Sequence, residues 1–178
     1  SFKGSIMREY GKIHTVIWQD DDFRGMSEDG RTLFLYLLTC PHGNMLGCFR
    51  LADAYAAEDL KWEMERVRKG FAELFEKRFA YRCGTSFWVF IRKYLMWNQF
   101  ENPNVAMAAA KMFEKLTCPD MVKALLAGAL RDFSPKFKAS ILVDFLNGIE
   151  PFANPFETIS KTRARAGKRN SLPSLWLW

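Results

Sequence analysis

The chain has 178 residues, of which 26 are basic and 20 are acidic, and its formal net charge is +6. The hydrophobic content of 49% is that of an ordinary globular protein, which excludes wholesale disorder. The apolar runs are far shorter than a membrane span, and no signal segment opens the chain, so we expect an intracellular protein with no membrane partner.

The positive charge is concentrated near the end of the sequence. Residues 161–178 contain no acid, which leaves only +1 of the total for residues 1–160. We therefore expect residues 149–178 to form a flexible basic tail that attracts polyanions without regard to sequence. The tail residues that would supply this attraction are Lys161, Arg163, Arg165, Lys168 and Arg169.

The first predicted elements are a strand and a helix. Residues 1–12 lack periodicity and are expected to form an N-terminal arm. Residues 13–18 are β-branched and aromatic, which predicts a short strand. Ser27 precedes two acidic residues and a helical repeat of leucines, so we expect it to cap a helix that ends near Cys40.

The middle of the chain predicts two helices and a β-hairpin. Residues 47–51 favour a brief strand and residues 52–57 a short helix. Apolar residues recur at helical spacing from Leu60 to Phe75, which predicts a long helix over residues 59–77 with Asp59 as its cap. Two apolar runs, 79–82 and 87–91, flank a loop in which Gly84 is expected to supply a positive φ.

The remaining elements are predicted to be mainly helical. Residues 92–100 fit either an extended arm or a helix, whereas residues 105–116, 119–131 and 137–147 favour helices. We therefore divide the chain into an arm (1–12), a winged-helix domain (13–100), additional helices (101–148) and the basic tail (149–178).

The order of elements over 13–100 is that of a winged helix-turn-helix. The expected fold class is thus mostly α with a small β-hairpin, followed by additional C-terminal helices. In this fold the third helix enters the major groove of DNA and the hairpin contacts a flanking region. The candidate contacts to duplex DNA are Lys61, Trp62, Arg66, Arg68, Lys69, Arg82, Arg92 and Lys93.

An alternative interpretation applies to the same residues. Basic side chains that alternate with Glu63, Glu65 and Glu73 are also typical of a solvated, salt-bridged helix face. Trp62 is compatible with a place in the core or in a protein interface as well as with a nucleic-acid contact. Phosphate contacts of this kind would supply affinity rather than sequence specificity.

Several segments also resemble a known protein family. The matching residues are 12–20, Phe23, Met26, Ser27, 33–39, Gly47, Phe49, Arg50 and the stretch from Trp97 to Asn104. Over about residues 12–117 the chain resembles phage replisome organisers and the N-terminal winged-helix domain of DnaD-type replication initiators; Met26 stands where that family usually has Leu. The resemblance implies a protein of the bacterial cytoplasm that binds origin DNA and recruits a replicative helicase or its loader.

Catalytic, cofactor and metal motifs are not apparent in the sequence. The two histidines lie apart from the cysteines, and no phosphate-binding glycine loop is present. The run Asp20–Asp22 is more typical of a solvated turn than of a Mg²⁺ site. The four cysteines lack a C-x-x-C pair and are expected to be buried thiols. We expect a protein that is not an enzyme and needs no cofactor.

The sequence thus predicts a phage-type replication initiator, and homo-oligomers are compatible with it. Two alternatives remain open: a winged-helix transcription regulator, and a phage-encoded inhibitor that uses the same fold to block a host protein. The low charge of residues 1–160 is compatible with the inhibitor, because a surface that faces a protein needs no excess of basic side chains.

Overall fold

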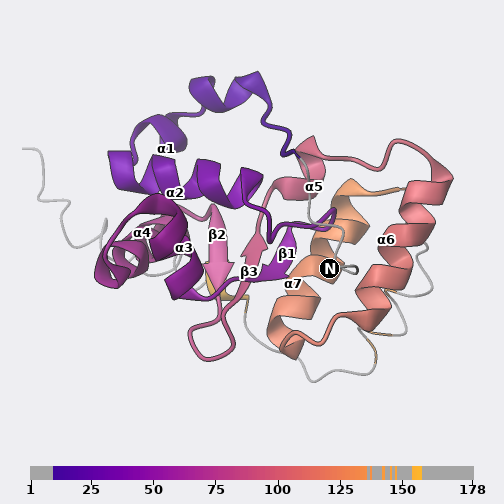
Figure 1. The fold of residues 1–178 in the computed structure, drawn as a ribbon. Coiled ribbons are helices and arrows are strands. Elements are labelled where there is room, and N and C mark those ends of the chain that lie inside the picture. Colours follow the sequence, from indigo (N-terminus) through magenta and orange to yellow (C-terminus); the bar gives the residue numbers. More distant parts are fainter. Residues whose placement is uncertain are drawn as a thin grey trace, which may run out of the picture.

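The computed structural model describes residues 10–135 together with residues 137, 142, 145, 147 and 154–157. This part of the chain is mainly helical and contains one small antiparallel sheet (Figure 1), as the sequence predicted. The elements are η1 (Thr15–Gln19), α1 (Asp21–Arg24), α2 (Glu28–Thr39), β1 (Cys48–Arg50), α3 (Asp53–Leu60), α4 (Met64–Glu76), β2 (Ala80–Arg82), β3 (Trp88–Ile91), α5 (Tyr94–Trp97), α6 (Pro103–Lys115) and α7 (Asp120–Phe133).

The sheet has the strand order β1-β3-β2, so β3 is its central strand. Phe49 of β1 pairs with Val89, and Tyr81 of β2 pairs with Phe90. Both the predicted strand at 47–51 and the predicted hairpin are therefore confirmed. β1 therefore joins the sheet although helices α3 and α4 separate it from the hairpin in sequence. The sheet lies between these two helices and α7 (Figure 1).

The predicted strand at residues 13–18 is wrong. Residues 15–19 form the 3₁₀-helix η1, which begins where His14 Nδ1 accepts a hydrogen bond of 3.3 Å from Val16 N. β-Branched residues favour strands when they pack on the face of a sheet. Here the segment arches over α2 away from the sheet (Figure 1), and Trp18 is largely exposed with its ring edge-on to Phe23.

Helix α2 begins at the predicted cap. Ser27 Oγ accepts a hydrogen bond of 3.0 Å from Gly30 N, and two acidic residues follow in the first turn. The buried side of the helix carries Leu33, Phe34, Leu37 and Leu38. The cap and the apolar repeat predicted from the sequence are both confirmed.

The single long helix predicted over residues 59–77 is interrupted. Helix α3 continues to Leu60, Lys61 adopts a left-handed conformation with φ of 55°, and α4 begins at Met64. The amide of Trp62 donates to the Ala57 carbonyl at 2.9 Å, which closes the end of α3 in the manner of a Schellman turn. Asp59 is therefore not a cap, and its carboxylate instead accepts a hydrogen bond of 2.6 Å from the Tyr36 hydroxyl.

The residue with positive φ in the hairpin is not the one predicted. Gly84 is exposed at the tip but is not among the residues with positive φ, whereas Phe87 has φ of 60° just before β3. The Phe87 amide donates to the Cys83 carbonyl at 2.9 Å. The left-handed residue thus lies at the base of the loop.

The two helices predicted after the hairpin are confirmed. Residues 92–100, which fitted an arm or a helix, contain the short helix α5, and Asn102 then caps α6 by accepting hydrogen bonds from the amides of Asn104 and Val105. The predicted helix at 137–147 lies mostly outside the described residues. The five basic tail residues and positions 1–9 of the arm also lie outside them.

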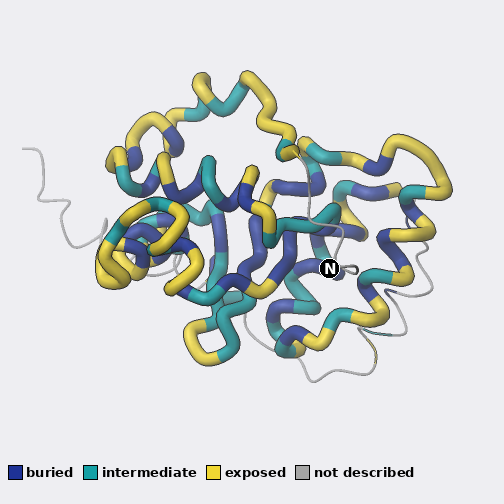
Figure 2. Tube along the Cα trace, viewed as in Figure 1, coloured by how far each residue is buried: buried dark blue, intermediate teal, exposed yellow. Residues whose placement is uncertain are grey.

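One hydrophobic cluster joins the sheet, α2, α4 and the later helices. Leu126 and Leu130 of α7 belong to the same cluster as Leu33, Leu74 and Phe90. Buried positions therefore follow the centre of the molecule, and exposed positions follow the outer sides of α4 and α6 (Figure 2). Among the described residues, no helix combines the length and the apolar character that crossing a membrane requires.

Candidate nucleic-acid interface

Helix α4 presents one charged side to solvent. Val67, Gly70, Phe71 and Leu74 recur at spacings of three and four residues and are buried. The opposite side contains Glu65, Arg68, Lys69, Ala72 and Glu76, all of which are exposed. Among the described elements, α4 has its principal contacts with α2, α3 and β2, whereas those of α7 are with β3 and α5.

Helices α2 and α4 approach closely at two glycines. A Cβ atom added at Gly70 would lie 2.7 Å from Leu33 Cδ2, and one added at Gly30 would lie 2.5 Å from Glu73 Oε2. A side chain at Gly70 would displace the end of the Leu33 side chain, and one at Gly30 would displace the Glu73 carboxylate. The two glycines therefore leave room for Leu33 and Glu73 between the helices.

Two polar contacts reinforce this packing. Glu73 accepts hydrogen bonds from the Ser27 amide at 2.7 Å and from the Ser27 hydroxyl at 2.5 Å. Arg66 binds Asp29 through two hydrogen bonds of 2.8 and 2.6 Å. The guanidinium lies 4.3 Å from the centroid of the Trp62 ring, and its hydrogen bonds lower the pKa of Asp29. Arg66 thus has an internal role, in holding α4 and Trp62 in place.

A buried carboxylate joins α3, α4 and the hairpin. Asp53, in the first turn of α3, is almost fully buried and lies 2.9 Å from Arg82 Nη1 of β2. Arg68 of α4 donates to the same carboxylate at 3.2 Å. The Arg82 guanidinium also lies 4.9 Å from the Phe71 ring, and its side chain is only 12% exposed. These contacts place the base of the hairpin against both helices.

The structure separates the eight candidate DNA-binding residues into distinct environments. Lys61 and Trp62 lie in the turn between α3 and α4, where Lys61 pairs with Glu58 at 2.5 Å. Arg68 and Lys69 lie on the exposed side of α4, with the Arg68 side chain about half exposed. These four residues and Arg66 therefore lie together on the surface formed by the α3–α4 turn and α4.

Arg92 and Lys93 lie near the other end of α4. Both line a cavity that also includes Lys77, the residue that ends α4. At about 1.5 Å per helical residue, α4 separates this region from Lys61 by roughly 20 Å. Lys93 lies 4.0 Å from Asp20, and Arg92 lies over the Phe156 ring at 5.6 Å. Arg92 and Lys93 thus belong to a different surface from Lys69.

The positive and negative charges on α4 cancel, which weakens the electrostatic attraction of this helix for a polyanion. The helix contains Arg66, Arg68 and Lys69 and also three glutamates, so its formal net charge is zero. The partners of Arg66 and Arg68 are remote in sequence, which is why the sequence did not reveal them. No sequence pattern singled out Arg50, which is the exposed last residue of β1 and donates to the Ser86 carbonyl at 3.3 Å beside the hairpin loop.

The hairpin contains a thiol with unusual acidity. Partial burial disfavours the charged form of Cys83, but the polar groups of Ser86 and Thr85 outweigh that effect and lower its pKa to about 7; the Thr85 hydroxyl lies 3.5 Å from the thiol. The other three cysteines are buried, as expected, whereas Cys83 is partly exposed. The hairpin thus carries a natural chemical probe of its own surroundings.

Neither metal-binding groups nor similar proteins identify the site. Within the described residues, His, Cys, Asp and Glu side chains do not gather in groups of three or more that could hold a metal ion. Comparison of the chain with protein-family models, with curated proteins and with solved structures gives no match. The functional argument therefore depends on the geometry of the chain itself.

The Asp53 contacts lead to a prediction about stability. The substitution Asp53→Ala leaves the largely buried Arg82 without its counter-ion and should lower the free energy of unfolding by about 3 kcal/mol, measured by urea denaturation. Glu58→Ala removes an exposed ion pair on the same helix and should cost less than about 1 kcal/mol. Equal losses in the two variants would show that Asp53 does not hold these elements together.

The Cys83 environment leads to a prediction about pH. Because its pKa is lowered to about 7, the rate of alkylation by iodoacetamide should reach half its maximum near pH 7, whereas an ordinary cysteine does so near about pH 8.5. Thr85→Ala removes the hydroxyl that lies 3.5 Å from the thiol and should move this midpoint upward. Mass spectrometry identifies the modified residue. A midpoint in the unsubstituted protein at or above that of an ordinary cysteine would contradict the assignment.

Proposed function

We propose that the protein is a winged helix-turn-helix protein that binds duplex DNA, with α4 as its recognition helix. The supporting observation is the order of elements: α2, β1, α3 and α4 precede the β2–β3 hairpin, and β1 pairs with the far strand of that hairpin. The turn at Lys61 separates two short helices, as the helix-turn-helix arrangement requires.

The proposed DNA surface combines the α3–α4 turn, the exposed side of α4 and the hairpin loop. Lys61, Arg68, Lys69 and Arg50 would supply contacts to phosphates, and the Arg82–Asp53–Arg68 contacts keep the hairpin and α4 in one arrangement. Arg66 and Arg82 would act by positioning these elements. Arg92 and Lys93 lie too far along α4 to share a contact with Lys61.

We further propose that this binding serves phage-type replication initiation. The proposal rests on the resemblance of residues 12–117 to replisome organisers and DnaD-type initiators. In such a role α6 and α7 would face a replicative helicase or its loader, since α4 remains available for the duplex. The basic tail residues would add an attraction for DNA that does not depend on the DNA sequence.

A second candidate function is inhibition of a host protein by the same surface. The zero net charge of α4 favours it, because a protein partner needs no excess of positive charge. A winged-helix transcription regulator is distinguished from an initiator by its footprint, which would cover a promoter instead of a replication origin.

The DNA proposal is tested with charge-matched double variants. Lys61→Ala with Lys69→Ala should weaken duplex binding at least about tenfold, equivalent to about 1.4 kcal/mol, in a gel-shift titration at low salt. The control is Lys111→Ala with Lys115→Ala, which removes the same charge from exposed positions on α6. Arg66 is left unchanged because it holds α4 against α2.

Two outcomes would contradict the DNA proposal. The first is an equal loss of affinity in both double variants, which would indicate attraction by net charge alone. The second is capture of a host protein that persists after nuclease treatment and is lost in the Lys61 and Lys69 variant, together with no duplex binding. That outcome would support the inhibitor.

A further inference from the structure

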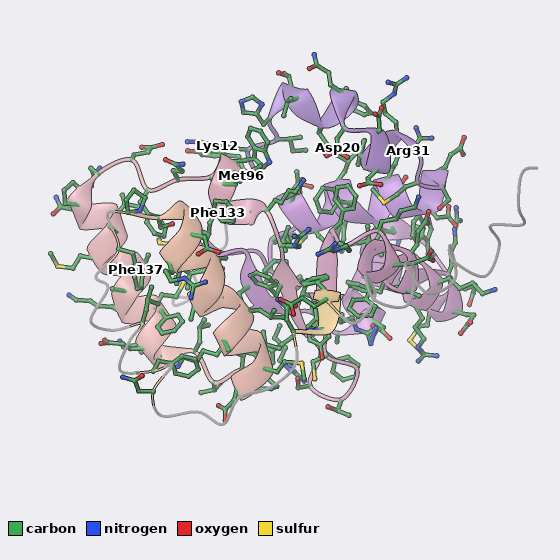
Figure 3. All side chains as sticks on the ribbon, turned by 180° about the vertical axis from the view of Figure 1, so that it is seen from behind. Lys12, Asp20, Arg31, Met96, Phe133 and Phe137 are labelled. Atoms are coloured by element: carbon green, nitrogen blue, oxygen red, sulfur yellow. The ribbon has the colours of Figure 1, made fainter. Side chains whose placement is uncertain are left out.

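A cavity of about 420 Å³ lies at the end of α4 remote from Lys61. It is enclosed between the η1–α1 segment, α2, the start of β2 and the β3–α5 junction. Lys12 and Asp20 lie at the two ends of the η1 arch that covers it (Figure 3). The volume is within the range of small-molecule sites, which is ~300–1,000 Å³. The proposed DNA surface does not use this cavity.

The walls of the cavity are largely apolar. Side chains from η1, from α2 and from the sheet line it, and most of them belong to the hydrophobic cluster or pack against it. The apolar lining residues that bear on the argument are Val16, Ile17, Phe34, Leu38, Phe79 and Ile91. Such walls favour a ligand with an apolar body.

Basic side chains gather on the floor of the cavity. Lys77 and Arg78 come from the end of α4, and Arg92 follows β3. Burial lowers the pKa of Arg92, and the nearby charge of Arg78 lowers it further, so the two guanidinium groups repel each other. Like charges held together beside an apolar space are stabilised when an anion enters between them.

The acidic groups at the cavity do not cancel this charge. Asp20 and Asp22 lie on the η1–α1 side. One Asp20 oxygen accepts a hydrogen bond of 2.9 Å from the Phe23 amide, and the other lies 4.0 Å from Lys93. Lys12 is paired with Glu101 at 2.7 Å. Lys77 and Arg92 therefore exceed the remaining lining carboxylate, Asp22, by one charge.

We propose that this cavity binds a small amphipathic anion, with its apolar body between η1 and Phe34 and its carboxylate or phosphate group at Arg92 and Lys77. The ligand would hold the η1 arch against α2 and β3, because its two ends contact both sides of the cavity. This binding is independent of duplex recognition by α4.

Calorimetry with the full chain and four simple probes tests the proposal. Octanoate and octyl phosphate combine an apolar chain with an anionic group, octanol lacks the charge, and inorganic phosphate lacks the chain. One molecule of octanoate or octyl phosphate should bind per chain, and octanol and inorganic phosphate should each bind at least tenfold more weakly. The tighter of the first two probes identifies the anionic group.

Three variants locate the bound probe. Arg92→Gln should weaken the preferred anionic probe about tenfold and leave octanol binding unchanged, while the charge-matched control Lys111→Gln should alter neither. Val16→Trp fills the apolar space and should abolish binding of both probes, with circular dichroism showing that the fold is retained.

Several results would overturn the proposal. They are the absence of saturable binding by either amphipathic anion, equal affinities for octanoate and octanol, and equal affinities for inorganic phosphate and octyl phosphate. Equal effects of Arg92→Gln and Lys111→Gln would also overturn it. Persistence of tight binding in a folded Val16→Trp variant would place the probe elsewhere.

Discussion

The carboxylate of Asp53, buried between Arg68 and Arg82, connects α3, α4 and the β2–β3 hairpin. A carboxylate in this position has lost its hydration, and two guanidinium groups compensate for the loss. Since the arginines come from α4 and β2, the orientation of the helix and that of the hairpin depend on the same contact. The buried residues Val67, Phe71 and Leu74 then determine which side of α4 remains exposed.

The basic residues of α4 therefore differ in role: some are bound within the protein, and others face solvent. Arg66 is bound to Asp29 and stacks on Trp62, so its charge serves mainly to hold α4 against α2. Lys69 and the α3–α4 turn provide positive charge toward solvent, and Arg50 adds a charge beside the hairpin. The proposed DNA surface contains so few basic side chains that it would gain much of its affinity from additional positive charge, which the sequence places at residues 161–178.

Local signals predicted much of the fold. Ser27 before two acidic residues located the start of α2, and the apolar repeat Val67, Phe71 and Leu74 located the buried side of α4. The break at Lys61 was missed because a left-handed helix end usually has glycine there. The ion pairs of Asp53 and Asp29 join residues 15 to 37 positions apart, and no local pattern reveals such pairs. The strand expected at residues 13–18 does not form, because a β-propensity alone does not make a strand when no neighbouring strand is in place to pair with it.

The salt dependence of duplex binding tests the central claim most directly. For each phosphate that a side chain neutralises, the slope of log K against log[salt] should be about −0.9. Binding through α4 predicts a steep negative slope for the full chain, and a slope shallower by about 1.8 when Lys61 and Lys69 are both replaced by alanine. The replacement of Lys111 and Lys115 should leave the slope unchanged. Duplex affinity that is insensitive to salt, or equal slopes in the two double variants, would contradict binding through α4.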